Sequence, residues 1–304
     1  MGYRPHAKPR SQTVVGELKS AYGPSPIAPS RQRAEGALII FAKAPIPGQV
    51  KTRLCPPLSP DEAASLHGSM VLDVLERSRA TRREQRKTSA TPAAFDRYLA
   101  CAPSADHVFF KVLQEREGVH LIDQSGEDLG ARLDHVSRSA FAKGYRRVVM
   151  VGTDSPSLPA TIYGEAFTLL SSHDLVLGPA LDGGYYLIGL TRPVPELFAG
   201  IPWSTDRVCA ITRERAERLG LRMALLPTWR DLDTLDDLLA MTKESEARSQ
   251  NRGPRTKPQS LALSPQPFYS ARTAGVLRLL ESRLRTRPVG QQDVSPGLGM
   301  SGAS

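Results

Sequence analysis

Cysteine is scarce in this chain of 304 residues, and its three copies lie far apart in the sequence. Cys55, Cys101 and Cys209 form no C-x-x-C pair, so the sequence predicts neither a disulfide framework nor a zinc site. It also lacks an apolar run long enough to cross a membrane, and no apolar segment of the signal-peptide kind follows the basic start. We therefore expect a soluble protein of the reducing cytoplasm.

Positive charge is in excess, with 40 Lys and Arg against 31 Asp and Glu, but it is concentrated at the two ends of the chain. Residues 1–35 carry a net charge of +4 and residues 242–304 carry +6, which leaves the middle at −1. Because these flanks are rich in Pro, Ser and Arg and lack periodicity, their charge does not point to a nucleic-acid-binding domain. We predict a disordered tail over 1–35, one folded domain over 36–247, and a linker with a short amphipathic helix, otherwise disordered, over 248–304.

In the folded domain, short apolar runs alternate with helix-like segments. This alternation predicts a mostly parallel sheet between two layers of helices, a Rossmann-like three-layer α/β/α fold. The strands are expected at residues 37–43, 97–102, 119–122, 146–152, 174–178, 185–190 and 221–226. The helices are expected at residues 60–79, 104–115, 127–143, 159–172, 204–219 and 234–246. The basic segment 79–91 should be an exposed insertion.

The first candidate binding segment is ALIIFAKAPIPGQVKTRL, residues 37–54, in which a strand runs into a loop rich in Pro and Gly. Ligands of open α/β sheets bind at the carboxyl ends of the strands, where this loop must lie. Lys51 and Arg53 are suited to a polyphosphate, and Gly48 lets the backbone approach it closely. The segment contains no Walker A sequence, and a solvated basic loop is the alternative interpretation.

Two carboxylates follow other strands, in VGTDSPSLP (151–159) and WRDLDTLDDL (229–238). Mg²⁺ and Mn²⁺ prefer oxygen ligands and commonly bind through one or two carboxylates together with substrate phosphates. We therefore predict a divalent cation site at Asp154 and Asp233. The alternative is structural, because Asp154 can organise a turn and Thr234 with Asp237 fits a capping box.

The segment LGPALDGGYYLIGL, residues 177–190, places two glycines between an acid and an aromatic pair. Asp182 is a candidate general base, and Gly183, Gly184 and Tyr185 suit a surface where a substrate ring approaches the backbone. A plain hairpin turn is the alternative.

Two further segments contain candidate ligand-binding residues. IPWSTDR (201–207) offers an aromatic plane at Trp203, which suits the protein core equally well. QSGEDLGARL (124–133) contains Gly126 and Arg132 at the start of a helix, where ordinary capping is the simpler explanation.

In combination, FAKAPIPGQVKTRL, QSGEDLGARL, VGTDSPSLP, LGPALDGGYYLIGL, IPWSTDRV and WRDLDTLDDL resemble a bacterial family of glycosyltransferase-like proteins. This family has the GT-A nucleotide-diphospho-sugar transferase fold and includes the arsenosugar-biosynthesis glycosyltransferases. The resemblance covers about Ala37 to Leu239. The family often has Cys at the position of Ser155 and Gly at that of Ser204, and the D-x-D motif of metal-dependent glycosyltransferases is not reproduced at Asp154.

The resemblance implies an enzyme that transfers a sugar from a nucleotide-diphospho-sugar donor to a small-molecule acceptor, assisted by Mg²⁺ or Mn²⁺. It implies Asp154 and Asp233 at the metal and Asp182 as the catalytic residue. The substrate-binding candidates are Lys43, Lys51, Arg53, Gly126, Arg132, Gly183, Gly184, Tyr185 and Trp203. Two alternatives stay open: a nucleotidyltransferase, because V-K-T-R-L loops also resemble those of small-cofactor guanylyltransferases, and a non-catalytic nucleotide-sugar-binding protein.

Overall fold

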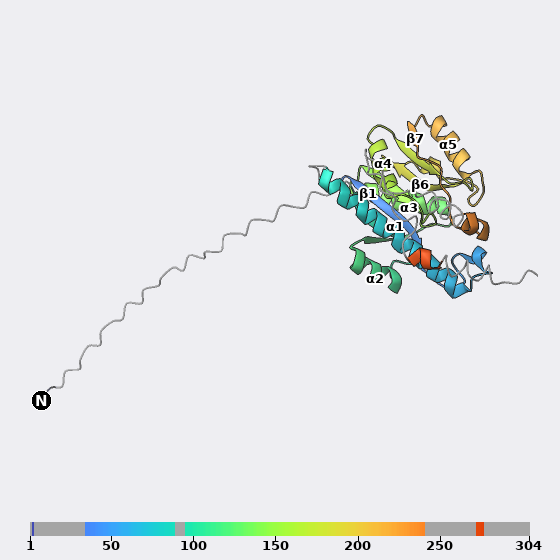
Figure 1. Ribbon diagram of the computed structural model, residues 1–304. Helices are drawn as coiled ribbons and strands as arrows, with labels where there is room; N and C mark the ends of the chain where they lie inside the picture. Colours follow the sequence, from blue (N-terminus) through green and yellow to red (C-terminus); the bar gives the residue numbers. More distant parts are fainter. Residues whose placement is uncertain (1, 3–33, 89–94, 241–271, 277–304) are drawn as a thin grey trace, which may run out of the picture. The chain divides into compact units, whose positions relative to one another are not determined.

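The computed structural model describes residues 2, 34–88, 95–240 and 272–276. The chain divides into a unit of residues 1–33 and a unit of residues 34–304, and all described residues except Gly2 belong to the second (Figure 1). The predicted disordered tail therefore lies outside the described residues, apart from Gly2 and its last two positions. The last two positions belong to the fold, since Ala34 is buried and Glu35 pairs with Arg147 at 2.9 Å.

A seven-stranded sheet in the order β3-β2-β1-β4-β6-β5-β7 forms the centre of the second unit. All strands are parallel except β6, which is antiparallel to both of its neighbours. The fold class predicted from the alternating pattern is confirmed. The strands are β1 (Gly36–Lys43), β2 (Phe95–Ala102), β3 (His120–Asp123), β4 (Arg147–Val151), β5 (Leu175–Pro179), β6 (Tyr185–Leu190) and β7 (Met223–Leu225).

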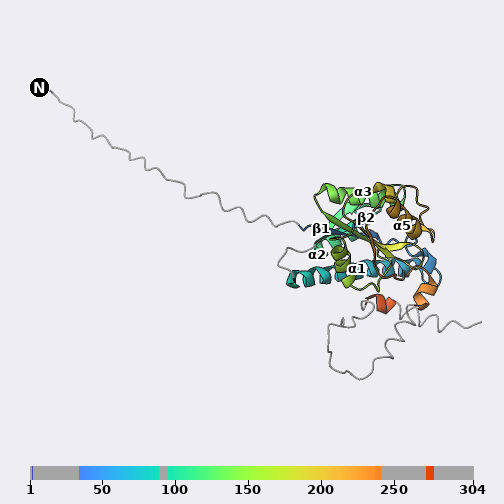
Figure 2. The same cartoon turned by 90° about the horizontal axis from the view of Figure 1, so that it is seen from above.

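Helices cover both faces of the sheet, and Figure 2 shows α1 and α3 on opposite sides of the strands. Leu38 and Ile40 of β1 pack with α1, α2 and α4, whereas Ala37 and Ile39 pack with α3 and α5. A central strand buried on both sides must be apolar throughout, which is the reason for the continuous run of β1. The helices are α1 (Pro60–Thr88), α2 (Val108–Glu117), α3 (Leu129–Ala142), α4 (Thr161–Leu169) and α5 (Val208–Arg218), with short 3-10 turns η1 (Thr52–Leu54) and η2 (Pro195–Leu197).

Helix α1 differs most from its prediction. It begins as expected, because Ser59 and Glu62 form a reciprocal capping box in which Ser59 N donates to Glu62 Oε2 at 2.9 Å. It then continues to Thr88, so the basic segment from Arg79 is largely helical and the prediction of an insertion there is wrong. Arg and Lys are good helix formers, and a solvated face can carry their charge without ending the helix.

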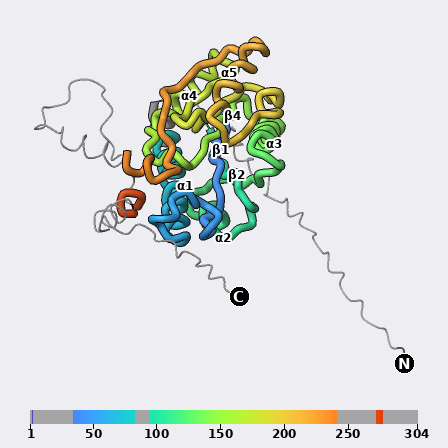
Figure 3. The backbone as a smooth tube through the Cα atoms, turned by 90° about the vertical axis from the view of Figure 1, so that its right-hand side faces the viewer, coloured from blue at the N-terminus to red at the C-terminus, as the bar shows by residue number. Residues whose placement is uncertain are grey.

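The described parts of the C-terminal region pack beside α1. Residues 235–240 are helical, and Thr234 with Asp237 forms the predicted capping box, in which Thr234 N donates to Asp237 Oδ2 at 2.9 Å. Residues 272–276 form a helical turn that lies against α1 (Figures 1 and 3). Thr273 Oγ1 donates to the buried carboxylate of Asp73 at 2.7 Å. The rest of the predicted linker and amphipathic helix lies outside the described residues.

The antiparallel β6 forms a hairpin with β5. The turn between them, residues 180–184, lies at the carboxyl edge of the parallel strands, because β5 ends there and β6 begins there. The same edge receives the segments that follow β1 and β4. The hairpin thus brings the predicted Asp182-Gly183-Gly184 turn to the side of the sheet where the other candidate residues lie.

Candidate active site

The ammonium of Lys51 is the centre of the candidate site. Its Nζ contacts Asp154 Oδ1, and it donates to Asp233 Oδ1 at 2.8 Å and to the Leu232 carbonyl at 2.7 Å. The Lys51 side chain is 4% exposed, whereas those of Asp154 and Asp233 are 44% and 39% exposed. The structure thus brings together three predicted site residues from distant parts of the sequence. The enclosed ammonium differs from the expected arrangement, in which Lys51 faces a diphosphate.

Charge within this cluster is mutually stabilised. Burial by itself lowers the pKa of Lys51, but attraction to Asp154 and Asp233 outweighs it, so the pKa lies above its ordinary value. Burial likewise raises the pKa of Asp154, and the neighbouring Lys51 ammonium more than compensates and holds it below its ordinary value. Lys51 is therefore a cation and Asp154 an anion at neutral pH.

Backbone contacts fix the positions of the three charged groups. Lys51 has a left-handed backbone (φ 49°) just before η1, and the next apolar residue, Leu54, is fully buried. Leu232 N donates to the Asp154 carbonyl at 2.8 Å, which joins the segments that carry the two carboxylates. Leu232 packs in one buried cluster with Leu54, so the same core holds both sides of the site.

Asp231 is a further acid that the sequence prediction passed over in favour of Asp233. Its carboxylate accepts a hydrogen bond from Ser155 Oγ. Burial, together with the negative charges of Asp154, Asp182 and Asp233, raises the pKa of Asp231 to about 7, although the Ser155 hydroxyl opposes the shift. The sequence signal was present in the paired acids of WRDLD, but the motif does not show that burial raises the pKa of Asp231.

The turn of residues 180–184 contributes Asp182, which is exposed. Asp182 Oδ1 accepts from Gly184 N at 2.9 Å, so this oxygen stabilises the turn. Gly183 has φ +88°, and a Cβ there would lie 2.0 Å from the Asp206 carbonyl oxygen. A glycine is required at position 183 because the loop before α5 packs directly on the turn.

Trp203, on the loop before α5, packs toward the core rather than presenting an exposed plane for a substrate. Its ring meets that of Tyr185 edge-on, with centroids 6.4 Å apart, and both rings pack against the core on the α3 side of the sheet. A Cβ on Gly130 would lie 2.7 Å from the Trp203 ring, so Gly130 admits the indole. The following Ser204 has φ 65°, the conformation of glycine, which explains why the resembling family often has Gly there.

Three exposed or half-buried polar groups surround this edge. Lys43, at the end of β1, is exposed and close enough to Asp154 to help lower its pKa, and Arg53 is exposed in η1. Arg132 of α3 donates from Nε to the Gly126 carbonyl at 3.0 Å, which ties these two predicted residues to each other. No described contact joins this pair to the Lys51 cluster.

Sequence reasoning missed His67 of α1. Its Nε2 donates to the Lys43 carbonyl at 3.1 Å, and its buried Nδ1 has no hydrogen-bond partner among the described residues. Burial lowers the pKa of His67, with Asp154 opposing the shift, so the imidazole is neutral. A lone His on a helix such as α1 gives no sequence signal that would place it beside Asp154.

The donor set of this cluster suits a divalent cation only in part. Asp154, Asp233 and the Leu232 carbonyl are oxygen donors, as Mg²⁺ and Mn²⁺ prefer, but all three face the Lys51 ammonium. Within the ranges that the structure describes, no three Asp, Glu, His or Cys side chains are grouped so as to hold a metal ion. A divalent cation fits the two carboxylates if the ammonium leaves its position between them.

Comparison with known proteins agrees with this architecture. Residues 86–205 match the model of a family described as "Uncharacterized protein conserved in bacteria (DUF2064)". The crystal structure of a "putative nucleotide-diphospho-sugar transferase" from Desulfovibrio desulfuricans G20 is 31% identical to the chain. The match covers 83% of this chain and 97% of that one, with a TM-score of 0.66. The chain belongs to the same bacterial family. The resemblance inferred from the motifs is confirmed.

Two other solved structures match the chain with lower similarity. A cytidylyltransferase from Leptospira borgpetersenii serovar Hardjo-bovis (strain JB197) is 15% identical, with 85% of this chain and 100% of that one covered and a TM-score of 0.44. A CMP:2-keto-3-deoxy-manno-octonic acid synthetase is 12% identical, with 70% and 99% covered and a TM-score of 0.42. No curated protein matches the chain. In the described part of this family member, no helix combines the length and apolarity that a membrane span needs.

Proposed function

We propose that this chain transfers a sugar from a nucleotide-diphospho-sugar to a hydroxyl of a small-molecule acceptor. The observation that carries the proposal is that exposed cations and carboxylates converge at the carboxyl edge of the sheet. Lys43 is close enough to Asp154, and Asp182 to Asp231, to influence their pKa values, and Arg53 is exposed two residues after Lys51. Such an edge suits an anionic diphosphate next to an acceptor. Membership in the family of the Desulfovibrio protein, over nearly the whole length of that protein, supports the same assignment.

In the proposed reaction, the bond between the sugar carbon and the diphosphate oxygen breaks and a bond to the acceptor oxygen forms. Lys43 and Arg53 bind the diphosphate and stabilise the charge that develops on it as it leaves. Asp182 accepts the acceptor proton through Oδ2, since its Oδ1 is engaged by Gly184 N. A divalent cation held by Asp154 and Asp233 would neutralise further charge on the diphosphate when bound.

The remaining candidates have supporting roles in the proposal. Gly126 and Arg132 border the nucleotide, and Gly183 and Gly184 let the sugar approach the backbone of the turn. Trp203 and Tyr185 pack edge-on beneath this surface and hold the loop before α5 in place.

The first test is a thermal-shift screen of UDP-, GDP-, ADP- and dTDP-sugars and of the four nucleoside triphosphates, each with Mg²⁺, Mn²⁺ or EDTA. A ligand at 100 times its dissociation constant stabilises the folded state by about 2.7 kcal/mol, which corresponds to a shift of roughly 5–10 °C. Stabilisation by one diphospho-sugar, followed by release of the nucleoside diphosphate with an acceptor, supports the proposal. Release of pyrophosphate from a triphosphate would indicate nucleotidyl transfer instead, and donor binding without turnover would indicate a binding protein.

Variants locate the site. Arg53→Ala and Lys43→Ala should each weaken donor binding about tenfold, because each removes one charge-assisted contact to phosphate. Arg218→Ala is the matched control, because Arg218 is an exposed arginine of α5 that pairs with the exposed Glu214 at 3.9 Å. Equal donor affinity of Arg53→Ala, Lys43→Ala and Arg218→Ala would refute the placement of the diphosphate.

A further inference from the structure

All three donors of the Lys51 ammonium have acceptors within the protein. A lysine ammonium carries three N–H groups, and Lys51 Nζ contacts three oxygens, those of Asp154, Asp233 and the Leu232 carbonyl. With its side chain only 4% exposed, this ammonium has little access to solvent or to a ligand. The two carboxylates are about ten times as exposed. The cation therefore lies beneath two anions that face outward.

The three oxygens surround one point in space and are anchored by backbone. The Leu232 N–H to Asp154 carbonyl bond of 2.8 Å fixes the two acidic segments against each other. Two carboxylates and a carbonyl around one point resemble the oxygen donor set of a hard divalent cation. Lys51 occupies that point.

The charge balance explains why the ammonium and a divalent cation exclude each other. The two carboxylates and the Lys51 ammonium together carry a net charge of −1. When the ammonium leaves, the two carboxylates alone carry −2. Two cations cannot share the same carboxylate oxygens, because like charges at such separations repel strongly in a partly buried site.

We propose that Lys51 is an internal competitor of a divalent cation: its ammonium fills the position between Asp154 and Asp233, and a divalent cation binds there only after the ammonium has moved to another anion. The diphosphate of a bound nucleotide is that anion, a part of the inference that rests on the proposed function. Cation and nucleotide binding are then coupled, and each raises the affinity for the other.

The test measures Mn²⁺ binding to the full chain by electron paramagnetic resonance, without nucleotide and at pH 7.5. Lys51→Met should bind one equivalent of Mn²⁺ at least about tenfold more tightly than wild type, since it frees both carboxylates and removes the competing charge. Lys51→Gln should behave similarly. The double variant Lys51→Met/Asp154→Asn should lose the gain, which assigns the new site to this carboxylate pair.

Lys111→Met is the matched control. Lys111 also pairs with an aspartate, Asp106, at 2.9 Å, but both side chains are exposed and only one carboxylate is involved. This variant should bind Mn²⁺ no more tightly than wild type. Circular dichroism checks that each variant is folded.

Two results would overturn the inference. One is wild-type protein that binds an equivalent of Mn²⁺ as tightly as Lys51→Met, and the other is a folded Lys51→Met protein with no gain over wild type. Should both Lys51 variants fail to fold, reductive methylation of wild type followed by peptide mass spectrometry tests the enclosed ammonium on which the inference depends. Lys51 should react at least about tenfold more slowly than Lys111, because its ammonium is enclosed and its pKa is raised, and equal rates would refute an enclosed ammonium.

The Mn²⁺ titration and the methylation contain no nucleotide, so their outcome is independent of which reaction the protein catalyses. Failure of the proposed function would appear as absence of donor binding or turnover with the competition by Lys51 intact. Failure of the inference would appear as tight Mn²⁺ binding by wild type with donor binding intact.

Discussion

Asp231 should make the stability of the protein depend on pH in a direction opposite to that of an ordinary surface acid. Its pKa is about 7 in the folded protein against 3.8 as the ordinary value. Between these values the folded state binds a proton that the unfolded state releases, so stability falls as pH rises from about 4 to about 7. Above that range the loss of stability caused by ionised Asp231 no longer changes with pH. Asp231→Asn removes the titrating group and keeps an oxygen that can accept from Ser155.

The expected gain follows from the size of the pKa shift. About three units correspond to about 4 kcal/mol of penalty at pH 8, and only about 1.5 kcal/mol is present at pH 5. Asp231→Asn should therefore stabilise the protein by about 2–3 kcal/mol more at pH 8 than at pH 5, or by roughly 5–10 °C in Tm. The assay is thermal unfolding followed by circular dichroism at both pH values.

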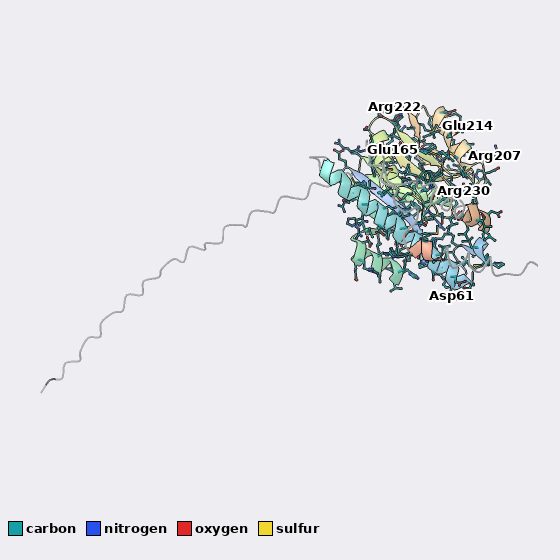
Figure 4. All side chains as sticks on the ribbon, viewed as in Figure 1. Asp61, Glu165, Arg207, Glu214, Arg222 and Arg230 are labelled. Carbon is teal, nitrogen blue, oxygen red and sulfur yellow. The ribbon has the colours of Figure 1, made fainter. Side chains whose placement is uncertain are left out.

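Asp174→Asn is the control of opposite sign. Asp174 pairs with Arg222 at 3.1 Å at the other edge of the sheet, and the hydrogen bonds from Arg222 lower the pKa of Asp174 (Figure 4 labels Arg222). The stabilisation from the ionised Asp174 is present above the unfolded pKa and is lost only in stronger acid. Asp174→Asn should therefore lower Tm equally at pH 5 and pH 8. A Tm difference for Asp231→Asn that is the same at both pH values would refute a raised pKa for Asp231.

Three other predictions concern packing and the outer parts of the site. Gly183→Ala should lower Tm by several degrees, because the new Cβ would lie 2.0 Å from the Asp206 carbonyl oxygen, and calorimetry measures the loss. Thr273→Val should destabilise by about 1–3 kcal/mol in urea unfolding, because it removes the hydroxyl that bonds to buried Asp73. Arg53→Ala should leave Tm within about 1 °C, because surface substitutions away from packed features are nearly neutral.

The first two of these variants each have a comparison within the chain. Gly200 has a positive φ of 61°, and a Cβ there would have no atom within 4 Å. Gly200→Ala should therefore lower Tm only through backbone strain, which Gly183→Ala also introduces. Equal losses for the two glycines would contradict the close contact at 183. Thr168→Val removes an exposed hydroxyl bonded to a helix carbonyl and should cost little. A loss as large as that of Thr273→Val would contradict a special role for the buried Asp73 bond.

Much of the fold was predictable because its elements have strong local signals. The buried strands β1 and β4 are continuous apolar runs, and the capping residues of the helix at 235–240 are visible in the sequence. The length of α1 was not, since a basic stretch is compatible with either a helix or an exposed insertion. The antiparallel direction of β6 also has no local signal, although the glycines at 183 and 184 indicate a turn.

The sequence predicted which residues form the site better than it predicted how their side chains are arranged. The motifs predicted Lys51, Asp154 and Asp233 at one edge of the sheet. In the structure the Lys51 ammonium contacts both carboxylates. That Lys51 points inward depends on its left-handed backbone and on burial of Leu54, which are tertiary properties. His67 and Ser155 lie next to the charged groups because of how α1 and the segment after β4 pack.

The hairpin of β5 and β6 has a consequence for how this protein can change. The position of residues 180–184 is set by the register of β6 on β4, with Val151 opposite Leu187, and β5 joins β6 through this turn without an intervening helix. A turn of this kind tolerates replacement of its exposed residues, such as Leu181, without moving the helical layers. Family members can therefore diversify the surface next to Asp182 while the charged cluster around Lys51 stays the same.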